Sequence, residues 1–344
     1  MPARREIKPP LRPMQFQSEN PTPLQETESG PVLERAPLGR PHPARRRLRR
    51  LFNPVTGWFR RLEREASFFL GNRVYPHLPG LTGPYGFQLR RSLTVTAGEL
   101  TLPRLPPDLD GLTLLLITDI HTGPFLSAAS LGLAFQRLME LDPHLILLGG
   151  DLVTGHVREF DRAADAFRSL HAPLGVHAVL GNHDHYTGDA CGLKRRMESA
   201  GIHVLHNQSV LLSRGEGSFH LAGIDDLNWG EPDLEAALAG TVHEGREAAT
   251  PPVILLSHNP DIFFEACRRD VDLVLAGHTH GGQIRIPGWG VLVRMSRFHL
   301  DEGLFQMGNS RMVVSRGLGA TGVPLRFSCP PEAVLVTLRS PAPR

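Results

Sequence analysis

Short apolar runs alternate with amphipathic stretches from about residue 90 onward. The runs of strand length are residues 112–118, 145–148, 176–180, 253–256 and 273–276. Between them, apolar side chains at helical spacing mark residues 131–141, 160–170 and a segment near 261–267. Strands that are apolar along their whole length are typical of sheets covered on both faces. The pattern therefore predicts an α/β fold with buried strands.

Weaker signals fill the rest of this region. Strands are expected at residues 202–205, 209–212 and 219–224, and helices after Asp189 and within residues 231–238. Asp189 can begin its helix because aspartate is a preferred capping residue. The tail, residues 283–338, is punctuated by glycine and rich in β-forming residues, so it is expected to add strands. We take residues 81–344 as one domain.

The first 80 residues do not follow this alternation. Residues 1–42 are rich in Pro, Arg, Gln, Glu and Ser without periodicity, which predicts a disordered arm. Residues 43–80 are expected to form a basic amphipathic helical segment, because Val55, Trp58 and Phe59 lie at helical spacing among arginines. Such a helix either lies on an anionic membrane surface, through residues 43–64, or docks on its own domain. The sequence leaves both readings open.

Charge is distributed unevenly along the chain. Residues 1–64 carry 14 Lys/Arg and 6 Asp/Glu, so the remaining 280 residues carry 23 Lys/Arg and 29 Asp/Glu. A basic arm on an acidic body predicts an anionic partner for the arm and disfavours nucleic acid as the partner of the body. The chain shows neither a long apolar window nor a secretory pattern, and its three cysteines are far apart. We therefore expect a cytoplasmic protein, peripheral to the membrane if the basic helix binds it.

Five short motifs each follow an apolar run directly. They are Asp119-Ile120-His121, Gly149-Gly150-Asp151, Gly181-Asn182-His183-Asp184, Ser257-His258-Asn259-Pro260 and Gly277-His278-Thr279-His280. Taken alone, each of the first two is more often a simple turn, and a lone histidine is more often a satisfied core or surface group. Five clusters of ligand-type residues, each just beyond a strand, together predict a metal site.

The residue types and spacing in these motifs fit metal ligation. Residues two apart in an extended chain point the same way, so Asp119 and His121 can bind one ion together. His278 and His280 share that spacing. An ionised carboxylate such as Asp151 has two oxygens that can bridge two cations. Mixed nitrogen and oxygen ligands fit Mn, Fe, Zn or Co, and the sequence does not choose among them.

The ordered motifs resemble those of the calcineurin-like metallophosphoesterase superfamily, over roughly residues 110–285. The resemblance implies a four-layer αββα sandwich with two divalent metal ions at the C-terminal strand ends. By position, the first ion would be held by Asp119, His121 and His280. The second would be held by Asn182, His258 and His278, with Asp151 bridging the two. His183 would be the catalytic histidine and Asp184 the partner that fixes its imidazole.

Such a site implies a phosphoester hydrolase. Two divalent ions attract a phosphate and lower the pKa of a bridging water, so that hydroxide can attack phosphorus at neutral pH. His183 can hydrogen-bond a phosphoryl oxygen or protonate the leaving alkoxide. Asp184 would set the tautomer and orientation of that imidazole.

Three flanking segments refine the expected substrate. Residues 281–284, 315–319 and 324–327 resemble the bacterial branch of membrane-associated phosphodiesterases, which includes an alternative UDP-2,3-diacylglucosamine pyrophosphatase. The resemblance implies a phosphodiesterase or pyrophosphatase in lipid metabolism, with a lipid-linked substrate. Arg316 and Arg326 are candidate ligands of the substrate phosphate, because a guanidinium fork matches phosphate oxygens. Arginines that merely solvate the surface are the alternative.

Other functions use the same residues. A nuclease or a cyclic-nucleotide phosphodiesterase would need the same site, and the basic arm could contact its phosphates. A non-catalytic interaction scaffold would be expected to have lost ligands, and none is missing. Protein phosphatases of the superfamily carry GNHE where this chain has GNHD, which disfavours that activity. The sequence leaves the oligomeric state open.

Overall fold

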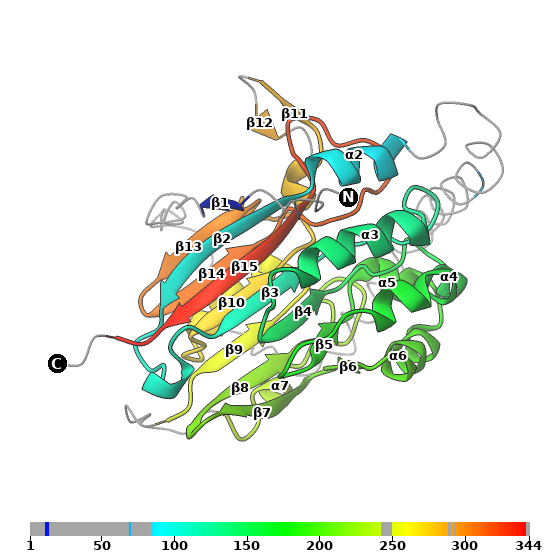
Figure 1. The fold of residues 1–344 in the computed structure, drawn as a ribbon. Helices are drawn as coiled ribbons and strands as arrows, with labels where there is room; N and C mark the ends of the chain where they lie inside the picture. The colour runs from blue at the N-terminus through cyan, green and yellow to red at the C-terminus, as the bar shows by residue number, and fades with distance from the viewer. Residues whose placement is uncertain are drawn as a thin grey trace, which may run out of the picture.

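Two β-sheets lie face to face, and helices cover the outer face of each (Figure 1). The computed structural model describes residues 11–13, 69, 84–241, 250–287, 290–291 and 294–341. Apart from residues 11–13 and 69, the predicted disordered arm and most of the predicted basic helical segment lie outside the described residues.

The first sheet has seven strands. In order across the sheet they are β1 (Leu11–Pro13), β2 (Thr94–Thr101), β15 (Glu332–Arg339), β3 (Thr113–Ile117), β4 (Leu145–Gly149), β5 (Val176–Val179) and β6 (Ile202–Val204). Strands β3 to β6 run parallel to one another, and β15 is antiparallel to β3. The helices on this side are α2 (Pro84–Ser92), α3 (Ala128–Met139), α4 (Val157–Arg168), α5 (Asn182–Tyr186) and α6 (Ala190–Ser199).

The second sheet has six strands. Their order is β13 (Gly303–Met307), β14 (Ser310–Val314), β10 (Leu273–Ala276), β9 (Val253–Leu256), β8 (Gly217–Gly223) and β7 (Gln208–Arg214). The four inner strands are parallel, and the two edge strands are antiparallel to their neighbours. Helices α7 (Leu234–Ala237) and α8 (Phe263–Cys267) belong to this side, and a hairpin of β11 (Arg285–Ile286) and β12 (Gly290–Val291) follows β10.

Three apolar cores separate the four layers. The first lies between the first sheet and helices α2, α3, α4 and α6, and it includes Leu115 of β3. The second lies between the two sheets and includes Leu114 and Leu116 of the same strand. The third lies between the second sheet and the helices on its outer face, and includes Leu255 and Phe263. Because successive side chains of β3 enter different cores, the strand is buried on both faces, and the predicted αββα arrangement is confirmed.

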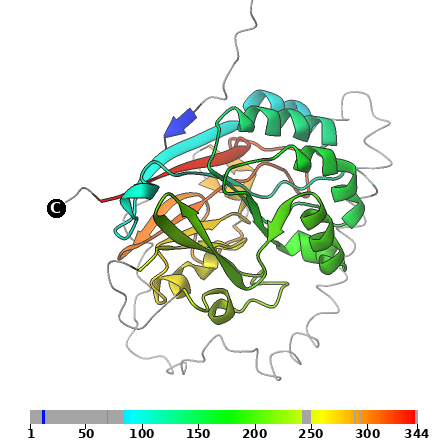
Figure 2. The same ribbon diagram turned by 60° about the horizontal axis from the view of Figure 1, so that its bottom comes forward.

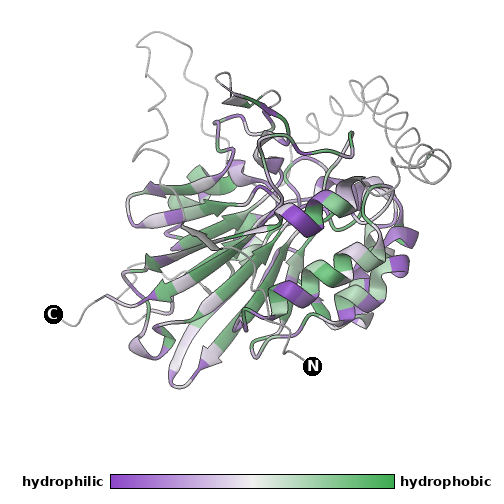
Figure 3. Ribbon diagram, turned by 45° about the horizontal axis from the view of Figure 1, so that its top comes forward, coloured by the Kyte–Doolittle hydropathy of each residue, from purple (hydrophilic) through white to green (hydrophobic). Residues whose placement is uncertain are grey.

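The distribution of polar residues agrees with these layers. In the view of Figure 2, helices α3, α4 and α6 lie on the outer side of the first sheet, and α8 lies beyond the second. Apolar residues run along the strands of both sheets, whereas the outer sides of the helices are polar (Figure 3). None of the helices in the described ranges is long and apolar enough to cross a lipid bilayer.

Most strands predicted from apolar runs are present. β9 and β10 have the predicted bounds, β4 and β5 differ from prediction by one residue at one end, and β3 is one residue shorter at each end. Asp189 begins α6 as predicted, because its side chain accepts a hydrogen bond from the Gly192 N–H. Strand β2 and helix α5 were not predicted. Within the segment predicted to be disordered, residues 11–13 form β1, which pairs with β2, and the disorder of the arm stays a prediction.

Candidate metal centre

The predicted ligands lie in loops at the carboxyl ends of parallel strands from both sheets. Asp119 follows β3, Asp151 follows β4 and Asn182 begins the helix after β5. In the second sheet, His258 follows β9 and His278 follows β10. Because the two sheets pack face to face, these five strand ends meet at one edge of the sandwich, where open α/β sheets place their ligands.

The backbone at this edge is not extended, although the predicted alignment of ligands two residues apart requires an extended chain. Asp119 and His121 have φ of 50° and 47°, and Asp151 has φ of 52°. His278 and His280 have φ of 71° and 53°. Non-glycine residues in this left-handed region cost free energy and are concentrated at functional sites. The residue pairs therefore converge through left-handed turns, and the prediction that strand alternation aligns them is wrong.

One group of side chains fits the predicted first ion. Ligand atoms of Asp119, His121, Asp151 and His280 all lie within 4.8 Å of one another. The Nε2 atoms of His121 and His280 are 3.1 Å apart, and His280 Nε2 lies 3.5 Å from Asp119 Oδ1. All four residues are at most 6% exposed. These donors surround a single buried point.

A second group adjoins the first through Asp151. His258 Nε2 lies 3.4 Å from Asp151 Oδ2, 3.1 Å from Asn182 Oδ1 and 3.1 Å from His278 Nδ1. The same Asp151 oxygen lies 3.6 Å from His121 Nε2 in the first group. Asp151 therefore occupies the bridging position. All seven predicted ligands are brought together.

The donor set fits divalent cations. It consists of two carboxylates, four imidazoles and one amide oxygen, which suit Mn, Fe, Zn or Co. Ring nitrogens of His121 and His280 face each other at 3.1 Å inside a buried cluster. Two nitrogen lone pairs at this distance repel unless a proton or a cation lies between them, and a buried polar group without a partner is costly. A pair of cations would satisfy the whole cluster.

Burial and mutual charge shift the pKa values of the ligands. Burial, together with the nearby Asp151 carboxylate, raises the pKa of Asp119 to about 6. Burial and the neighbouring His258 lower the pKa of His278 to about 3. Burial alone would lower the pKa of His258, but the carboxylates of Asp151 and Asp119 raise it well above its usual range. His278 is thus neutral at pH 7, as a metal ligand must be, whereas the neighbouring carboxylates favour the charged form of His258.

Two glycines allow the ligand loops to approach closely. A Cβ on Gly181 would lie 2.3 Å from Asp151 Oδ1, and a Cβ on Gly277 would lie 2.4 Å from Asp119 Oδ2. Both distances are shorter than any van der Waals contact. These positions require glycine because the backbone of one loop packs on the ligand carboxylate of another.

His183 lies beside the first group of ligands and is partly exposed. Its ring is 4.6 Å from the His121 ring, measured between centroids. Its Nδ1 lies 2.7 Å from the Thr154 carbonyl oxygen, and its backbone N–H donates to Asp151 Oδ1. A carbonyl only accepts, so Nδ1 carries a proton and Nε2 is the nitrogen left for chemistry.

Asp184 does not contact the His183 ring, so the predicted role is wrong for this residue. Its Oδ1 accepts hydrogen bonds from the N–H groups of Leu152 and Val153, at 2.9 and 3.2 Å. Its Oδ2 accepts one from the N–H of Gly181, at 2.9 Å. Asp184 therefore ties the loop after β4 to the start of α5. Burial and the charge of Asp151 raise its pKa to about 7.

Arg326 does not face a substrate. It is 2% exposed, and its Nε donates to the Gly319 carbonyl while its Nη1 and Nη2 donate to the carbonyls of His280 and Arg316. Nη2 also lies 3.2 Å from His280 Nδ1. With its nitrogens occupied inside the protein, Arg326 is unavailable to phosphate. It positions the metal ligand His280 instead, and the predicted role is wrong.

Arg316 is also occupied within the protein. Its Nη2 donates to Glu332 Oε1 at 2.6 Å, and its Nε lies 3.4 Å from Glu302 Oε2. Two carboxylates already neutralise this guanidinium, and the side chain is only 12% exposed. The prediction that Arg316 binds a substrate phosphate is therefore not supported by its placement.

Two buried acids at the end of β8 were missed in the sequence. Asp225 and Asp226 are 2% and 1% exposed. Asp226 Oδ1 has no hydrogen-bond partner among the described residues, and burial raises the pKa of this carboxyl group. The signal was present, because these acids follow the predicted strand 219–224 as Asp119 follows β3.

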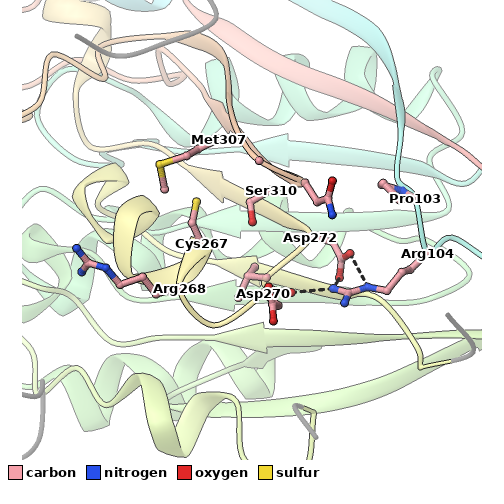
Figure 4. Close-up of a pocket in the computed structure, with 11 residues that line it drawn as sticks. Pro103, Arg104, Cys267, Arg268, Asp270, Asp272, Met307 and Ser310 are labelled. Carbon is pink, nitrogen blue, oxygen red and sulfur yellow. Dashed lines mark hydrogen bonds and ion pairs between the residues drawn. The ribbon is translucent and has the colours of Figure 1, made fainter. Parts of the chain in front are cut away.

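A separate pocket of about 330 Å³ lies at the opposite ends of the second sheet's strands. Its lining includes Asp272, which precedes β10, and Ser310, which begins β14. Arg104 projects into it but is already paired with both Asp272 carboxylate oxygens, at 2.7 and 2.9 Å (Figure 4). None of the metal ligands lines this pocket, so it is not part of the candidate centre.

Known proteins resemble this chain along the motif-bearing region. Residues 112–282 match the family model of the calcineurin-like phosphoesterase. A zebrafish (Danio rerio) transmembrane protein with metallophosphoesterase domain is 35% identical over 70% of this chain and 56% of its own length. The uncharacterized metallophosphoesterase YkuE of Bacillus subtilis is 33% identical, over 69% of this chain and 82% of that protein.

A third relative carries a more specific name. The phosphodiesterase YaeI of Escherichia coli is 32% identical over 65% of this chain and 81% of its own length. The chain thus spans most of the two bacterial relatives and little more than half of the zebrafish protein. The predicted superfamily is confirmed, while the predicted bacterial branch stays a prediction. All seven predicted ligands are present, and the chain belongs to the calcineurin-like phosphoesterase family.

Proposed function

We propose that this protein is a metal-dependent phosphodiesterase or pyrophosphatase whose substrate is linked to a lipid. The observation that carries the hydrolytic part is the position of Asp151, which lies between two complete ligand groups beside His183. A pair of divalent cations, when bound, supplies charge stabilisation for a phosphate and a nucleophile at neutral pH. The relative named phosphodiesterase YaeI supports a diester rather than a monoester as the substrate.

His183 supplies the protein's own acid–base group. The Thr154 carbonyl holds Nδ1, so the ring presents Nε2 as its second polar atom. In the imidazolium form, Nε2–H can donate to a phosphoryl oxygen or deliver its proton to the leaving alkoxide. Proton transfer of this kind contributes about 10²–10⁴-fold to a rate.

An apolar rim beside the candidate metal centre favours a substrate that is linked to a lipid. We define it as Phe87, Ile286, Val323, Leu325 and Phe327, which are between 39% and 53% exposed. Clusters of exposed large apolar side chains are unusual on monomeric soluble proteins and mark binding surfaces. The rim therefore offers a surface that acyl chains could cover.

Hydrogen bonds place this rim next to the metal ligands. The amide side chain of Gln88, in α2, donates to the Arg326 carbonyl and accepts from the Arg326 N–H. Phe327 pairs with Ile284 and accepts from the Arg285 N–H. Arg326, between rim residues Leu325 and Phe327, points inward and contacts His280. The same segment thus presents apolar side chains outward and supports a ligand inward.

Basic residues near the rim support contact with an anionic membrane. Arg90 and Arg91 form the last turn of α2, whose Phe87 belongs to the rim. Each basic residue near an anionic leaflet contributes about 1 kcal/mol to binding. Together with the predicted basic helix within residues 43–64, this surface supports a peripheral location on the cytoplasmic face of a membrane.

A substrate panel tests the proposal. Manganese-loaded protein would be assayed on bis(p-nitrophenyl) phosphate, a cyclic nucleotide, single-stranded DNA and UDP-2,3-diacylglucosamine, with and without the metal. The proposal expects metal-dependent cleavage of the acylated substrate with the highest kcat/KM. Leu325→Ser with Phe327→Ser should raise the KM for that substrate alone, and Leu211→Ser, equally exposed on β7, should not. Preference for DNA or the cyclic nucleotide would replace the lipid-linked substrate with the nuclease or cyclic-nucleotide alternative.

A further inference from the structure

A continuous row of rings leads away from the metal ligands on the His183 side. The His121 and His183 ring centroids are 4.6 Å apart, and those of His183 and Tyr186 are 4.7 Å apart. Tyr186 then meets Trp229 edge to face, with a centroid separation of 4.7 Å and an interplanar angle of 83°. Tyr186 and Trp229 are both partly exposed, so the row reaches the surface.

Buried acids fix the loop that carries Trp229. Asp226 Oδ2 accepts hydrogen bonds from the N–H groups of Asn228 and Trp229, at 2.8 and 2.7 Å. Asp225 Oδ2 accepts one from the Glu231 N–H at 2.7 Å. Since both acids are almost fully buried, this loop is held in one conformation although its indole is partly exposed. Rigid aromatic groups lose little conformational entropy when they bind a ligand.

A second contact joins this loop to the helix that carries Tyr186. His185 Nε2 lies 2.7 Å from Asp225 Oδ1, so α5 and the loop after β8 are held together. The neighbouring residues in α5, His183 and Tyr186, therefore keep a fixed distance from Trp229. The rings of Tyr186 and Trp229 therefore form a preorganised corner next to His183, the side chain that would protonate the leaving group.

We propose that Tyr186 and Trp229 form the subsite for a nucleobase, or a planar ring of that kind, carried by the phosphoester substrate. Two aromatic faces at a steep angle suit a flat π-system, which stacks on one ring and meets the edge of the other. On its other side, the His121 ring lies 4.9 Å from the His280 ring between centroids, and His280 contacts Arg326, which lies between rim residues Leu325 and Phe327 in the chain. Apolar chains and a planar base would thus be bound at opposite ends of the row of rings. This inference rests on the proposed phosphoesterase function.

Two small cyclic phosphodiesters isolate the contribution of the base. Uridine 2′,3′-cyclic phosphate and methyl riboside 2,3-cyclic phosphate share the strained diester and differ in the base. Manganese-loaded full-length protein should prefer the uridine compound in kcat/KM by roughly 5- to 150-fold, the factor given by about 1–3 kcal/mol of base stacking. Trp229→Ala should abolish this preference, and Trp229→Phe should retain most of it. Leu211→Ala, on the distant edge strand β7, should leave it unchanged.

Binding measurements separate the subsite from the catalytic proposal. By calorimetry, the wild type should bind uridine 5′-monophosphate more tightly than ribose 5-phosphate, and Trp229→Ala should bind both alike. If Trp229→Ala lost kcat/KM equally on both cyclic substrates, Trp229 would merely support His183, and the subsite would be overturned. Equal binding of both monophosphates by the wild type would also overturn it. If no substrate of the panel described above is cleaved but the binding preference is present, the subsite stands and the proposed function fails.

Discussion

At the His183 side chain, a hydrogen bond from Nδ1 to the Thr154 carbonyl fixes the tautomer, and the imidazole meets the ring of the metal ligand His121 edge to face, with 4.6 Å between the centroids. Its backbone N–H, by contrast, donates to Asp151 Oδ1. Substitution of the side chain therefore removes the proton donor and leaves the backbone contact to Asp151 in place. The catalytic and metal-binding roles can be separated at this residue.

His183→Ala should lower kcat by about 10²–10⁴-fold, the usual contribution of a positioned acid or base. Metal content, measured by mass spectrometry of the elements, should match that of the wild type. A variant that retains full turnover would show that another group transfers the proton. A variant that loses its metal would show that His183 belongs to the ligand set.

Arg326 provides a second test at this scale. Arg326→Met removes a charged donor from the carbonyls of Gly319, His280 and Arg316, and a hydrogen bond to a charged group contributes about 1.5–3 kcal/mol. The Gly319 carbonyl keeps the Tyr85 hydroxyl as a donor, and the His280 carbonyl keeps the Gln283 N–H. We expect the free energy of unfolding to fall by about 3 kcal/mol in denaturant titrations, and the affinity for metal to fall because His280 is no longer held. Arg326→Lys should not rescue either property, since an ammonium cannot reach these divergent acceptors. A loss below about 1 kcal/mol would refute this structural role.

At the scale of the elements, the ligand positions were predictable because each follows an apolar run. Strands such as β9 and β10 are marked by their composition, and the next polar residues must lie at the sheet edge. The left-handed backbone at Asp119 and His280 was not predictable, because positive φ is uncommon even for Asp and His, which adopt it more often than most residues. The role of Asp184 was missed for a related reason. Its partners, such as the Leu152 N–H, come from a loop that is distant in sequence.

Gly181→Ala tests the close packing of these loops. The new Cβ would lie 2.3 Å from Asp151 Oδ1 and 2.6 Å from the Asp151 nitrogen, so the bridging carboxylate or α5 must move. We expect a loss of bound metal and a fall in turnover of at least tenfold. Gly132→Ala, in the middle of α3, is the matched control because a Cβ there meets no atom within 4 Å. It should preserve activity and add about 0.5–1 kcal/mol of stability. Full metal binding by the Gly181 variant would contradict the observed packing.

At the scale of the whole molecule, the metal centre joins the two sheets. Asp119 and Asp151 come from the first sheet, whereas His258, His278 and His280 come from the second. The sequence predicted this sandwich through its resemblance to a known superfamily. Apolar periodicity alone predicted buried strands but could not assign them to two sheets, because strand pairing depends on contacts that are remote in sequence.

Because bound cations tie both sheets together, metal removal should destabilise the whole fold. A ligand present at 100 times its Kd adds about 2.7 kcal/mol to the free energy of unfolding. In scanning calorimetry, the manganese-loaded protein should therefore unfold several degrees above the chelated protein. In Asp151→Asn, the difference in unfolding temperature between the manganese-loaded and the chelated protein should be much smaller. An unfolding temperature that does not respond to chelator would mean that the cluster holds no metal in solution.

In the proposed centre, seven side chains hold two cations with Asp151 between them. Anomalous diffraction from crystals grown with manganese tests this most directly, because it locates the metal without reference to activity. We expect two peaks about 3.5–4 Å apart. One should be bound by Asp119, His121 and His280, the other by Asn182, His258 and His278, and both by Asp151. A single peak, or peaks elsewhere in the molecule, would contradict the account.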